Sequence, residues 1–152
     1  MATRKSKGKA PKAVELPADD AGERDAPVLF RLNVEVGNLA DAVRFYTELL
    51  GVRGRTDRGA RCYFDCGQVT LQVVDVSSTG PVDPAAALYF VVRDLDAVFV
   101  RARMLGCLSP DDVHGEPGGA IAVRPWGEKS FYVEDPWGNA LCFVEDGTVY
   151  RG

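Results

Sequence analysis

The chain has 152 residues, of which 46% are hydrophobic and 26% charged, and its formal net charge is −4. That length suffices for one domain with a sizeable core, and the composition is that of an ordinary soluble globular protein. No apolar run approaches the roughly 20 residues that a membrane span needs. The acidic balance argues against nucleic acid as the partner of the folded part. Because no apolar stretch follows the charged N-terminus, we expect a cytoplasmic protein.

The first 26 residues are expected to form a disordered tail. Residues 1–12 carry five basic side chains, and the stretch after them is acidic. Neither part has enough apolar surface to offset the entropy of ordering. A basic dozen would suit nucleic acid or a membrane surface, but a solubilising tail is the simpler interpretation. We place a single domain at 27–148 and a short C-terminal tail at 149–152.

The first half of the domain reads as one strand, one helix and three strands. Apolar and polar side chains alternate strictly from Phe30 to Val36, which is typical of a strand with two unlike faces. Asn38 is a good N-cap for the amphipathic stretch that follows, and Gly51 suits its C-terminal end. The predicted elements are a strand over 28–36, a helix over 39–50 and strands over about 52–56, 60–65 and 69–74.

The same order restarts after the turn-rich residues 75–84. Asp94 and Gly106 would cap the second helix as Asn38 and Gly51 cap the first. The predicted elements are a strand over 87–93, a helix over 95–105, a polar glycine-rich connection over 109–119 and strands near 120–124, 130–134 and 139–144. The two halves, about 28–74 and 86–146, therefore form an internal repeat of β-α-β-β-β modules.

Three stretches carry a resemblance to a known family. VGNLADAVRFYTELLG, VRDLDAVFVRARMLG and FYVEDPWGNALCFVED resemble the first helix, the second helix and the closing hairpin of the vicinal oxygen chelate superfamily, which holds glyoxalase I, bleomycin-resistance proteins and dioxygenases. The resemblance covers about residues 28–146. It implies an α+β fold whose two βαβββ modules form a curved mixed sheet around a ligand cup. Because the fold hosts unrelated chemistries, it does not fix an activity.

Metal enzymes of this superfamily carry one ligand on each of four strands, usually histidines and glutamates. The resemblance places these positions at Arg31, Gln72, Ala87 and Cys142. Arginine is a cation that only donates hydrogen bonds, and alanine has no donor atom for a metal. The chain has one histidine, His114, so a site with two histidines and a carboxylate cannot be assembled. We therefore expect no metal ligands and no cofactor.

The strand faces that point away from the helices would line the cup. The predicted ligand-binding residues are Arg31, Asn33, Glu35, Gln72, Tyr89, Trp126 and Cys142. Aromatic and small side chains with a few hydrogen-bonding groups are typical of a small-molecule site, and Trp126 at the rim would stack on a planar ligand. The alternative is that Arg31 and Glu35 pair with each other and the cup is filled.

Two polar side chains invite a catalytic interpretation. His114 lies in a polar loop near Asp111 and Asp112, but a general base needs a pocket, so we interpret it as a surface residue. Cys142 is interpreted as a small buried side chain of the cup. As a nucleophile it would need a nearby cation, and Arg31 would serve if the two strands were neighbours. All four cysteines lie in apolar or strand-like stretches and are expected to be free thiols.

The missing metal ligands favour a binding protein similar to the bleomycin-resistance branch. Such a protein would hold a small organic ligand, planar or anionic, as a homodimer whose subunits share the pockets, without nucleic acid or membrane as partners of the folded domain. The alternative is a lyase, isomerase or dioxygenase-type enzyme of the superfamily with an atypical or metal-independent site, in which Arg31 holds a substrate carboxylate or phosphate. A partner-recognition module with a degenerate pocket is a third possibility.

Overall fold

A computed structural model describes residues 27–57 and 59–152. The predicted tail over 1–26 lies outside these residues. The first half contains β1 (Arg31–Val36), α1 (Leu39–Leu50), β2 (Arg55–Thr56), β3 (Arg61–Cys66) and β4 (Val69–Asp75). The second half contains β5 (Leu88–Val92), α2 (Leu95–Leu105), β6 (Asp112–Val113), β7 (Glu116–Pro117), β8 (Ala122–Val123), β9 (Lys129–Glu134) and β10 (Ala140–Glu145). Over the described ranges, neither helix has the length and apolar character to cross a membrane.

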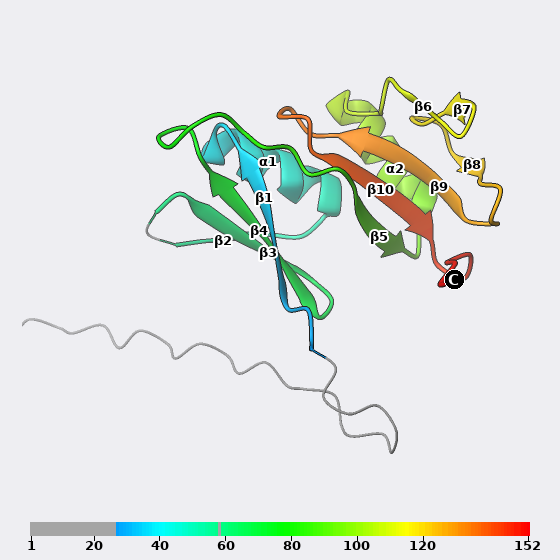
Figure 1. The fold of residues 1–152 in the computed structure, drawn as a ribbon, viewed down its shortest axis with the longest axis horizontal. Helices are drawn as coiled ribbons and strands as arrows, with labels where there is room; N and C mark the ends of the chain where they lie inside the picture. Colours follow the sequence, from blue (N-terminus) through cyan, green and yellow to red (C-terminus); the bar gives the residue numbers. More distant parts are fainter. Residues whose placement is uncertain (1–26, 58) are drawn as a thin grey trace, which may run out of the picture.

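Each half forms its own four-stranded mixed sheet. Sheet A has the order β1-β4-β3-β2, and sheet B has the corresponding order β5-β10-β9-β8. In both sheets the first strand runs parallel to the last strand of its module, and the remaining pairs are antiparallel. Figure 1 shows the two sheets side by side, with β1 and β5 toward the middle of the molecule. The predicted α+β fold of two βαβββ modules is therefore confirmed.

The helix ends follow the predicted capping residues. Asn38 Oδ1 accepts a hydrogen bond from the backbone N–H of Asp41 at 2.9 Å, and Asp94 caps α2 in the same way. Gly51 and Gly106 close the two helices at φ angles of 69° and 66°, in the left-handed region that glycine tolerates. The caps fix where each helix begins and ends, and the buried apolar side of each helix packs against the sheets.

Strand alternation sorts the side chains between two faces. Val34 and Val36 are buried in the main core, where Val73 is the register partner of Val34. Asn33 and Gln72, which are also register partners, lie on the opposite face. We call the faces turned away from the main core the cup faces of sheets A and B. The predicted ligand-binding residues of the first module all lie on the cup face of sheet A.

Two segments differ from the sequence prediction. The strand expected over 52–56 is only the two residues of β2, because Gly54 passes close to β3: a Cβ there would lie 2.3 Å from Cys62 Sγ. The connection expected over 109–119 holds the short β6–β7 hairpin. Beyond β10, Val149 packs against sheet B, and the N–H of Tyr150 donates to Glu128 Oε1 at 2.9 Å. The C-terminal segment thus forms part of the second module's surface.

The turn between β9 and β10 joins the two modules. Asp135 Oδ2 accepts hydrogen bonds from the Tyr46 hydroxyl of α1 at 2.7 Å and from Asn139 Nδ2 at 2.8 Å. Asn139 Nδ2 also donates to the backbone carbonyl of Glu35 on β1, and its Oδ1 accepts from the N–H of Ala85, both at 2.8 Å. Asn139 is 0% exposed. This turn therefore holds both modules in one arrangement and sets the position of the cup faces.

Candidate functional site

The cup face of sheet A presents a polar row whose groups contact one another. Gln72 Nε2 donates to Asn33 Oδ1 at 3.0 Å. The Arg31 guanidinium lies 5.1 Å from the centroid of the Phe30 ring and 5.8 Å from that of Tyr63. Such cation–π contacts stabilise an arginine without a carboxylate partner. The row is well ordered by its own contacts but forms no enclosed cavity by itself.

The alternative pairing of Arg31 with Glu35 is not what the structure shows. Glu35 Oε2 accepts a hydrogen bond from the backbone N–H of Asp83 at 2.8 Å, while Arg31 lies over the aromatic rings. Arg31 also belongs to sheet A and Cys142 to sheet B. The condition for Arg31 to activate Cys142, that their strands are neighbours, is therefore not met.

On the cup face of sheet B, two tyrosines meet over a cysteine. Tyr89 and Tyr132 are the register partners of Cys142 on either side. Their rings lie edge to face with centroids 6.3 Å apart, beside the Cys142 thiol. Burial raises the pKa of the Tyr132 hydroxyl and of the Cys142 thiol. Both groups are therefore neutral near neutral pH, and Cys142, at 0% exposure, is covered.

The four positions that hold metal in the superfamily do not fit a metal here. Arg31 brings a positive charge, Ala87 brings no donor atom, and Gln72 offers only a neutral amide oxygen, a weak metal ligand. Cys142 is a thiol whose pKa is raised by burial, whereas a metal binds the thiolate. In the part of the chain that the structure describes, no three or more histidine, cysteine, aspartate or glutamate side chains are grouped closely enough for a metal ion.

A hollow of about 370 Å³ opens on the cup face of sheet B. It is lined by Tyr89, Phe90, Val91, Trp126, Glu128, Val144, Val149 and Tyr150. Trp126 Nε1 donates to Glu128 Oε2 at 2.8 Å, and the Trp126 ring meets the exposed His114 ring edge to face at 4.7 Å. The structure thus brings the predicted residues Tyr89 and Trp126 to one hollow. It leaves Arg31, Asn33, Glu35 and Gln72 on the other sheet.

Arg124 is the residue of this region that sequence reasoning missed. It is 2% exposed. Its Nε donates to Ser130 Oγ at 3.0 Å and its Nη2 to the Ser130 carbonyl at 3.1 Å, and the guanidinium lies 5.3 Å from the centroid of the Tyr132 ring. Nη1 is buried and has no hydrogen-bond partner. The available signal was strand parity, because Arg124 is two residues after Ala122, the register partner of Ser130.

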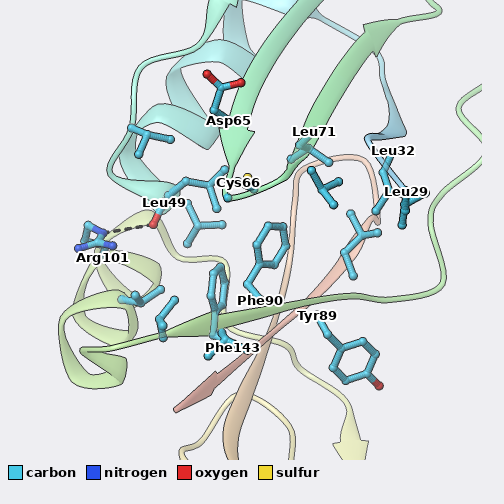
Figure 2. Close-up of a pocket in the computed structure, with 18 residues that line it drawn as sticks. Leu29, Leu32, Leu49, Asp65, Cys66, Leu71, Tyr89, Phe90, Arg101 and Phe143 are labelled. Atoms are coloured by element: carbon cyan, nitrogen blue, oxygen red, sulfur yellow. Dashed lines mark hydrogen bonds between the residues drawn. The ribbon is translucent and has the colours of Figure 1, made fainter. Parts of the chain in front are cut away.

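A larger cavity of about 550 Å³ lies between the modules, on the core side of the sheets. Figure 2 shows that the Phe90 ring points into this gap and that Tyr89 points away from it. Its lining is mainly apolar, and its charged groups are already bonded: Arg101 Nε donates to the Leu49 carbonyl at 3.2 Å, and Asp65 is in an ion pair. Because the hollow on sheet B brings together two of the predicted ligand-binding residues, Tyr89 and Trp126, we take it as the candidate site.

Comparisons with known proteins agree with this architecture. The "Oxidase ChaP-H2" structure shares 26% identity over 84% of this chain and 100% of that chain, with a TM-score of 0.67. "Oxidase ChaP-H1" shares 27% identity over 79% of this chain and 96% of that chain, with a TM-score of 0.65. A lactoylglutathione lyase from Agrobacterium tumefaciens shares 21% identity over 82% of this chain and 96% of that chain, with a TM-score of 0.59. That last likeness shows the fold alone.

A search of curated proteins gave no match. The family model described as Glyoxalase/Bleomycin resistance protein/Dioxygenase superfamily matches residues 29–143, which runs from the start of the first module into β10. Both modules, both helices and the closing hairpin fall within or overlap that range. The chain therefore belongs to the glyoxalase/bleomycin resistance protein/dioxygenase superfamily.

Proposed function

We propose that this protein binds a small organic molecule in the hollow on the cup face of sheet B, without a metal at the four strand positions. The observation that carries the proposal is the hollow itself, whose volume of about 370 Å³ falls in the range of small-molecule pockets. Its walls include Tyr89, Trp126 and Tyr150, which suit a planar ligand because aromatic rings stack on flat π systems. The donor set at Arg31, Gln72, Ala87 and Cys142 supports binding that does not depend on a metal.

The two tryptophans allow a direct test. Trp126 lines the hollow, while Trp137 packs against Gly37 and the main core. We expect 2-naphthamide, a planar neutral probe, to quench the fluorescence of Trp137→Phe, which keeps Trp126. The matched variant Trp126→Phe should respond far less. Quenching carried by Trp137, or the absence of any binding, would contradict the proposed site.

Metal analysis of protein purified without chelator or affinity tag tests the second part of the proposal. We expect transition metal far below one equivalent per chain, because the four positions lack a suitable ligand set. One equivalent per chain would show that the assignment of the four positions is wrong. Substitutions at Gln72, Cys142 and His114 would then locate the metal.

An enzyme is the second candidate, and one observation favours it. Two of the matched structures are named oxidases and share 26% and 27% identity with this chain. An oxidase-type activity would consume oxygen when a bound substrate is turned over. Oxygen uptake with candidate aromatic substrates, compared between wild type and Tyr132→Phe, separates this function from binding without turnover.

We also propose that two copies of the chain assemble as a homodimer. The apolar residues Phe30, Tyr89 and Val91 are 46%, 62% and 53% exposed, and Tyr89 and Val91 lie on β5, the first strand in the order of sheet B. Exposed apolar edges favour association with another chain. Sedimentation should show a dimer at micromolar concentration. A monomer under those conditions would refute this assembly.

A further inference from the structure

Arg124 is a buried cation whose hydrogen bonds are incomplete. Its guanidinium has three acceptors, the hydroxyl and carbonyl of Ser130 and, at 3.5 Å, the carbonyl of Ala120. All three are neutral, and none is reached by Nη1. In the described part of the chain no carboxylate forms an ion pair with Arg124. A buried charge without a counter-ion is costly, and so is a buried donor without an acceptor.

The unpaired nitrogen lies one layer of side chains from the hollow. Tyr132, over whose ring the guanidinium sits, touches Tyr89, and Tyr89 is part of the hollow's wall. Ser130, which binds Arg124, is the register partner of Val144, and Val144 also lines the hollow. The buried cation is therefore linked to the aromatic walls of the hollow through Tyr132 and Ser130.

The nearest carboxylate along the hairpin does not fill this role. Glu128 is buried, and both of its oxygens are engaged, Oε2 by Trp126 Nε1 and Oε1 by the N–H of Tyr150. Glu128 thus ties the tryptophan and the C-terminal segment to the β8–β9 hairpin. Among the described residues, no carboxylate is therefore paired with the Arg124 guanidinium.

We propose that Arg124 is the anion-binding residue of this site, and that the ligand is an aromatic carboxylic acid. The ring system lies between Tyr89, Trp126 and Tyr150, and the carboxylate accepts a hydrogen bond from Arg124 Nη1. This assignment rests on the proposed small-molecule function and deepens it by naming the ligand class. An arginine nitrogen suits a carboxylate because a hydrogen bond between two charged groups is stronger than one between neutral groups.

The carboxylate reaches Nη1 when the cover of the small cluster around Cys142 moves aside. Val113 of β6 and Val149 of the C-terminal segment pack on this cluster, and both are only half-buried. They come from the two-residue strand β6 and from the chain beyond β10. Binding therefore displaces side chains of the rim while the sheet stays unchanged.

The test compares two probes of the same shape in the full chain. 2-Naphthoate carries the carboxylate, and 2-naphthamide is its neutral counterpart. We expect wild type to bind the acid about 10- to 100-fold more tightly, the usual range for one charge-assisted hydrogen bond. In Arg124→Gln this preference should vanish while the affinity for the amide is kept. Arg31→Gln, which removes the exposed arginine of sheet A, should retain the preference.

The other possible outcomes of this binding experiment each contradict part of the proposal. Equal binding of both probes to wild type overturns the anion site and leaves the proposed function standing. Binding of neither probe overturns both. A preference lost in Arg31→Gln and kept in Arg124→Gln would assign the anion to sheet A. If Arg124→Gln does not fold, NMR of wild type with labelled arginine replaces it, with the Arg124 guanidinium signals assigned by comparison with Arg124→Lys. 2-Naphthoate should shift these signals and 2-naphthamide should not. Signals that 2-naphthoate leaves unchanged would refute the proposal.

Discussion

Replacing Asn139 by alanine tests whether the closing turn holds the two modules together. The side chain makes three hydrogen bonds, to the Glu35 carbonyl, the Ala85 N–H and the Asp135 carboxylate, each of 2.8 Å. Alanine removes all three from a site that is 0% exposed, where water does not readily replace them. One net hydrogen bond contributes about 1 kcal/mol, and a buried group left unpaired costs about 1–3 kcal/mol. We therefore expect Asn139→Ala to lower the free energy of unfolding by about 3–5 kcal/mol.

Urea unfolding followed by circular dichroism measures this loss. The matched control is Asn38→Ala, which removes an asparagine with one exposed capping bond within its own helix and should cost about 1 kcal/mol. Asn139→Asp is a second variant of equal size; it keeps an acceptor, loses both donors and sets a second carboxylate beside Asp135. We expect it to be at least as destabilising as the alanine. A loss at Asn139 no larger than that at Asn38 would refute the assignment of the turn as the junction.

Three further predictions concern pH, thiols and packing. Hydrogen bonds from Ser77 lower the pKa of Asp75 below 3.8, so this carboxylate stabilises the fold above its unfolded pKa and loses that contribution as the pH falls through the folded value. The difference in unfolding free energy between wild type and Asp75→Asn should therefore be largest above about pH 4 and shrink on acidification. Urea titrations at several pH values measure this difference. A difference that does not change with pH would contradict the prediction. Burial raises the pKa of both Cys66 and Cys142, but Cys66 is only half-buried. An aromatic disulfide reagent should therefore label Cys66 first, with the labelled residue identified by mass spectrometry. Rapid labelling of Cys142 would contradict its burial. Gly54→Ala should cost about 1–3 kcal/mol because its Cβ would lie 2.3 Å from a buried thiol sulfur; an unchanged urea midpoint would argue against that packing.

Local patterns were enough to predict the fold. The alternation from Phe30 to Val36 and the capping residues Asn38 and Asp94 act through neighbours in the sequence, and the structure confirms each of them. The repeat of this pattern predicted two modules. Strand content does not reveal which edges pair, and the chain forms two hydrogen-bonded sheets. Their relative placement depends on contacts such as that between Tyr46 and Asp135, which are 89 residues apart in the sequence.

The candidate site could be predicted only in part for the same reason. Face parity correctly grouped Asn33 with Gln72, and Tyr89 with Cys142, because register partners share a face. It could not show that Cys142 is fully buried beside Tyr132, since that depends on how β5, β9 and the C-terminal segment pack around β10. Arg124 was missed because an arginine at the end of a short strand usually reaches solvent. Its burial follows from the β8–β9 hairpin, which turns it onto Ser130.

The bond between Asn139 and β1 has a consequence for how such a protein can change over generations. Asn139 binds the carbonyl oxygen of residue 35 and the N–H of residue 85, and every amino acid supplies the first atom and every one but proline the second. Most substitutions at either position therefore leave these two hydrogen bonds intact. The cup-face side chain of residue 35 can therefore vary while the architecture is inherited unchanged. Because the two modules are joined through main-chain atoms, side chains at these positions can change without disturbing how the modules are arranged.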